Sequence, residues 1–269
     1  MKRTVVLLCL VVLMVPTGLA QARSIWLLPP DRSEVRLEAL HPRFQDSDFS
    51  TLSMLWTLAL DREVAPGRFV VVELPYTRFH SESADDASST FGNPYVGWHG
   101  KERDSYWHGE FGLRFPMTSD DEPAQVLAIL SDQIDNPEAW LPDIVSFRAE
   151  ACYVRQQPQS MGVKIGFGPI VWLDTGDQLS DEFEVFFHGH GHVLFVARET
   201  TVGLGLSGRF LLTTNGGATF HERTMQEISL FASRNVGTWR PAVRVRFPWD
   251  TVLDEYAETS IAVSLGYTF

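Results

Sequence analysis

The last eleven residues of the chain alternate strictly between two kinds of side chain. One set is mainly apolar and contains Thr259, Ile261, Val263, Leu265, Tyr267 and Phe269. The set between them is small or polar and contains Ser260, Ala262, Ser264, Gly266 and Thr268. A period of two is that of a β-strand, in which successive side chains point to opposite faces. The pattern therefore predicts a C-terminal strand with one apolar and one polar face.

Similar alternation recurs along most of the chain. The predicted strands lie at 34–41, 50–61, 68–79, 94–100, 106–117, 143–156, 161–173, 183–195, 199–210, 223–235, 239–247 and 259–269. Ordinary strands average about five to six residues, whereas strands that cross a bilayer need about nine to eleven. The length of these segments therefore favours strands that cross a membrane.

Strands in hydrocarbon must form a closed sheet, because each unpaired edge amide or carbonyl costs several kcal/mol. The sequence therefore predicts an all-β fold, a closed antiparallel transmembrane β-barrel of about 12 strands. Tight turns would join the strands at one end, and longer connections would face the outside of the cell. A soluble secreted β-sandwich is the alternative fold, because the apolar faces could pack on a protein core instead.

The longest connection, 118–142, contains a helical pattern. Within 123–133, the apolar residues Val126, Leu127, Ile129 and Leu130 follow an acidic start with helical spacing. We expect a short helix in an external loop, either capping the mouth of the barrel or lying near the lipid headgroups.

The N-terminus has the pattern of a secretory signal peptide. Lys2 and Arg3 precede an apolar run over 5–15, and Ala20 and Ala22 offer a small-x-small cleavage site. We therefore expect a signal peptide at 1–22, a single barrel domain at 23–269 and a location in the cell outer membrane. Cleavage would make the net charge of −12 more negative by two, which argues against nucleic acid as a partner. It would also leave Cys152 as the single cysteine, so that no intrachain disulfide can form.

The polar faces of the predicted strands carry many charges and histidines, which we expect to line the lumen. Those predicted to contact solute are Arg114, Arg148, Lys164, Glu184, His188, His190, His192, Arg209, Glu227, Arg240, Arg244 and Arg246. One interpretation is a salt-bridge network that stiffens the barrel. The other is a cationic stripe that attracts anionic or polar solutes in a narrow pore.

His188, His190 and His192 share one face of a predicted strand, at alternate positions. Two of these imidazoles could share a metal ion with Glu184 or His108, since histidine favours zinc, copper or nickel. A polar or pH-sensitive lumen and a plain structural role are the alternatives, and the sequence interpretation assigns no metal and no cofactor. Cys152 is interpreted as an incidental small residue rather than a nucleophile.

Two parts of the sequence resemble known outer-membrane proteins. The C-terminal strand ending at Phe269 resembles the signal by which the barrel-assembly machinery recognises its substrates. The stretches 69–76 (FVVVELPY) and 91–97 (FGNPYVG) resemble the phenol-degradation meta-pathway transporter-like family. In these stretches Gly92 and Pro94 suit a sharp entry from a loop into a strand. The resemblance implies a transport or channel role.

The sequence thus predicts an outer-membrane channel or transporter for a small solute, hydrophobic or anionic, that works without a cofactor. Its expected partners are outer-membrane lipid, the barrel-assembly machinery and the solute. An outer-membrane lipid hydrolase is one alternative, although no G-x-S-x-G motif singles out a nucleophile and no catalytic residue is assigned. A structural or adhesive barrel with an occluded lumen is the other.

Overall fold

The computed structural model describes residues 26–28, 30–44, 53–81, 86–101, 105–118, 123–157, 159–176, 179, 182–213, 223–249 and 257–269. Its strands are β1 (Glu34–Phe44), β2 (Met54–Ala65), β3 (Arg68–Ser81), β4 (Asp86–Phe91), β5 (Tyr95–Lys101), β6 (Trp107–Arg114), β7 (Ile144–Arg155), β8 (Met161–Asp174), β9 (Phe183–Ala197), β10 (Thr200–Leu211), β11 (Thr224–Arg234), β12 (Trp239–Pro248) and β13 (Ala257–Thr268). A helix, α2 (Pro123–Ser131), and a 3-10 turn, η1 (Pro137–Ala139), lie between β6 and β7. No described helix is long and apolar enough to cross a bilayer.

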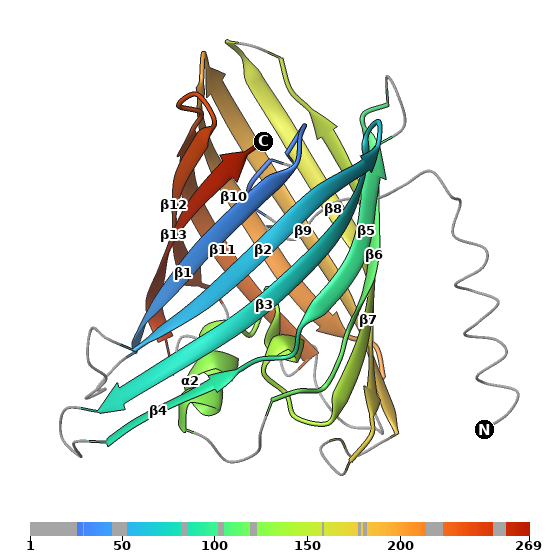
Figure 1. Cartoon of the computed structure of the whole chain (residues 1–269), viewed down its shortest axis with the longest axis vertical. Helices are drawn as coiled ribbons and strands as arrows, with labels where there is room; N and C mark the ends of the chain where they lie inside the picture. Colours follow the sequence, from blue (N-terminus) through green and yellow to red (C-terminus); the bar gives the residue numbers. More distant parts are fainter. Residues whose placement is uncertain are drawn as a thin grey trace, which may run out of the picture.

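The strands form one sheet that closes on itself (Figure 1). The first and last strands pair antiparallel, with Leu37 opposite Leu265, and β2 pairs with β3. Twelve strands make up the ring, whereas β4 pairs only with the outer part of β3, with Tyr76 opposite Phe91. The predicted twelve-stranded antiparallel barrel is confirmed, and the β-sandwich alternative is wrong because closure leaves a single continuous sheet.

The two ends of the barrel differ in how their strands are joined. At the turn end, which includes Phe269, short connections join β2 to β3, β9 to β10 and β11 to β12. Each of these three turns contains one residue with positive φ: Gly67, Arg198 and Gly237 in turn. At the opposite loop end the connections are longer, and the longest carries α2 and η1.

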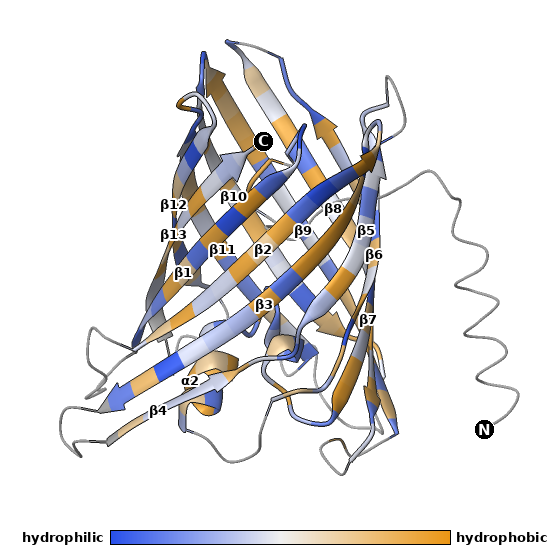
Figure 2. Cartoon of the chain, in the orientation of Figure 1, coloured by the Kyte–Doolittle hydropathy of each residue, from blue (hydrophilic) through white to orange (hydrophobic). Residues whose placement is uncertain are grey.

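The alternation of side chains is resolved into an apolar outside and a polar inside. On β13, Ile261, Val263 and Leu265 are 46–49% exposed, while Ser260 and Ser264, between and beside them, are 6% exposed. Figure 2 shows the same banding of polar and apolar positions along the other strands of the wall. In a soluble protein the apolar set would be buried; here it forms the outer surface, as a wall that faces lipid requires.

Glycines on the inner wall make room for large inward side chains. A β-carbon built at Gly97 would lie 2.5–2.7 Å from the ring of Tyr95 and its hydroxyl. One built at Gly266 would lie 2.8 Å from the carboxylate carbon of Glu34. Such approaches are closer than van der Waals contact allows, so these small residues set where the bulky polar groups of the lumen can lie.

Candidate functional site

The residues predicted to line the lumen do face the interior of the barrel. Ten of the twelve are buried, and Glu184 and Arg240 are half-buried. They lie on seven strands, β6 to β12. Their contact with a solute stays a prediction, because the structure shows most of them bound to other parts of the chain.

Residues 123–140, here called the loop plug, fold back from the loop end into the lumen. Arg209 on β10 donates hydrogen bonds to the carbonyl oxygens of Ile134 and Asp135, and it pairs with Glu138 at 2.9 Å. On the far side of the ring, the hydroxyl of Thr77 on β3 donates to the carbonyl of Ala124. Contacts with several separate strands place this segment inside the ring.

The helix α2 belongs to the loop plug (Figure 1). Leu127 and Ala128 are buried in the same apolar cluster as Leu40 of β1 and Leu55 of β2. The predicted helix at 123–133 is therefore confirmed, and of its two expected places the mouth of the barrel is the right one. The place near the lipid headgroups is wrong, because apolar side chains from the helix face the interior.

Asn93 joins the two ends of the long connection 118–142, which contains the loop plug, to the wall. Its side-chain nitrogen donates to the carbonyl oxygens of Glu138 and Leu141, and its side-chain oxygen accepts from Thr118. The amide is completely buried. A β-carbon at the preceding Gly92 would lie 2.8 Å from the ring of Trp140. The Gly-Asn-Pro stretch therefore does more than open a strand, since it also holds the inward fold of the long connection.

The pKa values of the acidic residues of the loop plug are shifted in different directions. Burial would raise the pKa of Asp135, but the guanidinium groups of Arg244 and Arg246 outweigh it and hold this pKa below its usual range. Arg209 does the same for the pKa of Glu138. For Asp132, burial outweighs the attraction of Arg246 and raises the pKa to about 7.

Residues 26–28, here called the turn plug, lie in the lumen, and Leu28 lines the cavity at the turn end. Trp26 is 1% exposed, and its ring packs edge-on against Phe231 of β11 at a centroid distance of 5.9 Å. Lys164 of β8 donates to the carbonyl of Leu27 at 2.7 Å, and Arg240 of β12 donates to that of Leu28 at 2.7 Å. Two lumen cations predicted to meet solute thus bind backbone carbonyls of the chain itself.

One arginine touches both plugs. Arg244 pairs with Asp135 of the loop plug and with Glu227 of β11, and its guanidinium lies over the Trp26 ring, 5.9 Å from the centroid. Arg246 pairs with the other carboxylate oxygen of Glu227 at 2.8 Å. A network of this kind is costly to break from one side, because the remaining buried charge is left unpaired. The salt-bridge interpretation of the lumen charges accordingly describes this part of the wall.

The plugs divide the interior into separate cavities. A vestibule of about 670 Å³ opens at the turn end and is lined by Leu28, His108, Arg198, Arg240 and other residues. A second cavity of about 40 Å³ lies between Trp26 and the loop-plug residues Asp135 and Trp140. The two share no lining residue, so among the described residues the plugs lie between two separate cavities.

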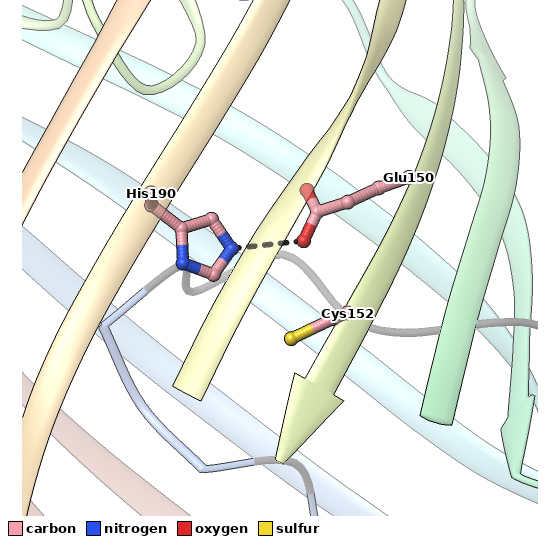
Figure 3. Close-up of side chains that lie close together, drawn as sticks. All are labelled: Glu150, Cys152 and His190. Atoms are coloured by element: carbon pink, nitrogen blue, oxygen red, sulfur yellow. Dashed lines mark hydrogen bonds and ion pairs between the residues drawn. The ribbon is translucent and has the colours of Figure 1, made fainter. Parts of the chain in front are cut away.

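The three histidines of β9 lie in a row on the inner wall. Each ring is at most 5% exposed, and neighbouring ring centroids are 5.8 and 5.1 Å apart. His190 is hydrogen-bonded to Glu150 of β7 at 3.0 Å, and Cys152 lies beside this pair (Figure 3). Among the described residues, the group with metal-ligand geometry is Glu150, Cys152 and His190. Neither Glu184 nor His108, the partners expected for the histidines, belongs to it.

Several residues that organise the lumen were not singled out from the sequence as site residues. The missed set is Trp26, Asn93, Asp132, Asp135, Asn136, Glu138 and Glu150. Asn93 lies within the stretch 91–97, and Glu150 lies two residues after Arg148 on the same face of the predicted strand 143–156, so both had a detectable signal. The others lie outside the alternating segments, where a period of two carries no information.

A closed twelve-stranded wall with an apolar outside and a charged, plugged inside defines the class: this is a β-barrel of the transmembrane type. Neither a protein-family profile nor a curated protein sequence matches the chain. The resemblance to the phenol-degradation transporter-like family is therefore not confirmed at the level of that family.

Solved structures do match the fold. An outer membrane channel from Pseudomonas putida F1 matches with a TM-score of 0.64 at 12% identity, over 93% of this chain and 100% of that one. The translocator domain of the autotransporter NalP from Neisseria meningitidis matches with a TM-score of 0.58 at 12% identity, over 90% of both chains. The NanC porin matches with a TM-score of 0.52 at 9% identity, over 88% of this chain and 100% of that one. At these identities the comparison shows a shared fold.

Proposed function

We propose that the chain is an outer-membrane channel or transporter for a small solute, closed in the described conformation by its two plugs. The observation that carries this proposal is the contrast between wall and contents. The wall is a closed, hydrogen-bonded ring with a charged inner face, while the plugs are separate segments attached to that face by side-chain contacts. A plug held in this way can leave without breaking the ring.

The vestibule supports a polar, anionic solute over a hydrophobic one. Its lining includes the cations Lys101, Arg32, Arg198 and Arg240, against the acids Asp31, Glu34 and Glu199. A cleft whose lining carries more charges of one sign than of the other raises the local concentration of ions of the opposite sign. In the orientation that we propose, residues 1–22 direct export, the turn end faces the periplasm and the loop end faces outward. Assembly of the barrel would proceed through β13.

The test is ion conductance in planar bilayers. We compare wild type, a variant lacking residues 23–30, a variant with 124–139 replaced by a short Gly-Ser linker, and the double variant. The double variant is expected to conduct steadily with a preference for anions, and wild type to conduct rarely. Heat-modifiable migration on gels checks that each barrel is folded. A folded double variant without ion current would end the channel proposal.

That negative result would favour the second candidate, a structural or adhesive barrel. The observation in its favour is the occupation of the lumen from both ends. A lipid hydrolase has less support, because among the described residues no serine hydroxyl is hydrogen-bonded to a histidine ring.

A further inference from the structure

A transition-metal site on the inner wall goes beyond the channel proposal and does not depend on it. We infer that Glu150, Cys152 and His190 bind one borderline or soft transition-metal ion, of which zinc is the representative. The ligand atoms of these three residues all lie within 4.8 Å of one another, and all three residues are buried. Thiolate, imidazole and carboxylate together are the donor set that proteins use for zinc.

The positions of the three residues follow from strand geometry. Glu150 and Cys152 are alternate residues of β7, so both point into the lumen. His190 comes from β9, and β8 lies between these two strands. The ion would therefore join two strands that are not neighbours, across the one that separates them (Figure 3).

Gly166 of β8 provides the space for this arrangement. A β-carbon built at Gly166 would lie 2.7 Å from Oε1 of Glu150 and would collide with the ring of His190. Any other residue would separate the imidazole from the carboxylate. The cluster thus depends on a residue whose only contribution is the absence of a side chain.

The histidines beside the cluster have ring nitrogens without protein partners. Among the described residues, Nε2 of His188 and Nδ1 of His190 have no hydrogen-bond partner, nor has either ring nitrogen of His192. Leaving a buried polar group without a partner costs about 1–3 kcal/mol, so these nitrogens favour a bound partner such as water or an ion. His188 is 1% exposed, and its Nδ1 lies 3.7 Å from Oε2 of Glu150. His188 therefore lies beside the cluster, but it does not belong to the group of three residues whose ligand atoms lie within 4.8 Å of one another.

The surrounding charges select the kind of ion. Arg148 holds Oε2 of Glu150 at 2.9 Å and leaves Oε1 turned toward His190, as an outer-shell partner of a metal ligand does. Lys164 is near enough to interact electrostatically with Cys152, and Arg148 is bonded to Glu150. A hard cation held by one carboxylate would therefore meet net repulsion. A soft or borderline ion gains a bond to the thiolate of Cys152, which releases its proton on binding, and magnesium or calcium does not.

An entry route leads from the turn end. His108 of β6 is paired in register with Cys152, and it lines the vestibule of about 670 Å³. An ion in the vestibule is therefore one residue away from the cluster. The turn plug lies beside this route, because Leu28 lines the vestibule and Lys164 binds the carbonyl of Leu27.

The test is titration of the full-length folded barrel in detergent with Co²⁺, followed by competition with Zn²⁺. Wild type should develop a thiolate-to-cobalt charge-transfer band that saturates at one ion per chain, and zinc should remove it while excess Mg²⁺ should not. Cys152→Ser should fold and lose the band.

Two further variants keep the inference falsifiable if Cys152→Ser fails to fold. His190→Gln and Gly166→Ala should each weaken cobalt binding by about 10–100-fold. His192→Gln should leave it unchanged, because this ring leans over Gly205, on the β10 side of its strand and away from Glu150. A wild-type barrel without the band, or a band of equal strength in folded Cys152→Ser, would overturn the site. Neither result bears on ion conductance, so the channel proposal is tested separately.

Discussion

The loop plug and the turn plug fill the same lumen in different ways. The loop plug is a long segment with its own helix, and its acidic side chains are paired with Arg209 and Arg244. The turn plug is a short segment in which Leu27 and Leu28 are held through their carbonyl oxygens. Hydrogen bonds with one ionised partner are roughly twice as strong as neutral ones, and both plugs have them. Only the loop plug also has ion pairs in which both partners are charged.

The difference indicates that the two plugs differ in the free energy needed to withdraw them from the lumen. A segment fixed by buried ion pairs is expensive to withdraw, because each pair leaves an unpaired charge behind. A segment fixed by backbone carbonyls and one aromatic side chain leaves behind cations that the water of the vestibule can solvate. We therefore expect the turn plug to release first, and four measurements test this ranking.

The largest effect is expected from Arg209→Ala. This change removes every hydrogen bond from Arg209 to the loop plug and leaves Glu138 buried without its partner. Breaking a buried pair from one side costs about 3–5 kcal/mol, so amide exchange of residues 123–140 should accelerate at least 100-fold. Hydrogen exchange with mass spectrometry measures this. Arg198→Ala, which removes an exposed arginine at the turn end, should change nothing in that peptide.

A smaller effect is expected at the turn plug from Lys164→Met. The variant keeps the length of the side chain but cannot donate to the carbonyl of Leu27. A hydrogen bond to a charged group contributes about 1.5–3 kcal/mol, which corresponds to about 10–100-fold faster exchange of the peptide that contains residues 26–28. Lys101→Met serves as control, since that lysine is exposed. If Lys164→Met accelerated exchange of the turn plug more than Arg209→Ala accelerates exchange of the loop plug, the ranking of the plugs would be reversed.

The pH dependence of the loop plug should be about tenfold between pH 8 and pH 6. The pKa of Asp132 is raised to about 7 when the plug is docked and returns to about 3.9 when it is released, so the docked state takes up the extra proton. Docking therefore strengthens on acidification, and this contribution is lost as the pH rises through 7. Asp135 and Glu138 stay ionised throughout, because their pKa values are lowered. Exchange should slow at pH 6 in wild type and not in Asp132→Asn, after correction for the intrinsic rate.

The smallest effect concerns the coupling of the two plugs. Arg244 contacts both Trp26 and Asp135, so loss of one plug should loosen the other. A double-mutant cycle between Trp26→Ala and Arg209→Ala should give an interaction energy of at least about 0.5 kcal/mol. Exchange rates of residues 123–140 in the two single variants and the double variant supply the cycle. Strict additivity would mean that the plugs move independently.

The sequence predicts the wall of the barrel much better than the segments that fill its lumen. Each strand carries its own period-two signal, which is local, and the length of the segments separates membrane strands from ordinary ones. That was enough to predict twelve strands, the inward face and a helix near 123–133. The same signal placed the cations on the lumen face but could not say whether they pair within the chain or meet solute; Lys164 and Arg240 are bound to the chain itself.

What the sequence alone determined about this protein is the closed barrel, because alternation, strand length and the cost of unpaired edges in lipid leave few other solutions. What only the tertiary structure decided is how the lumen is filled and which ligands come together. The contacts that fix the plugs join residues 75 positions apart for Arg209 and Ile134, and 212 apart for Arg240 and Leu28. Such pairings arise from the closure of the ring, which brings distant strands around one small interior, and no local pattern encodes them.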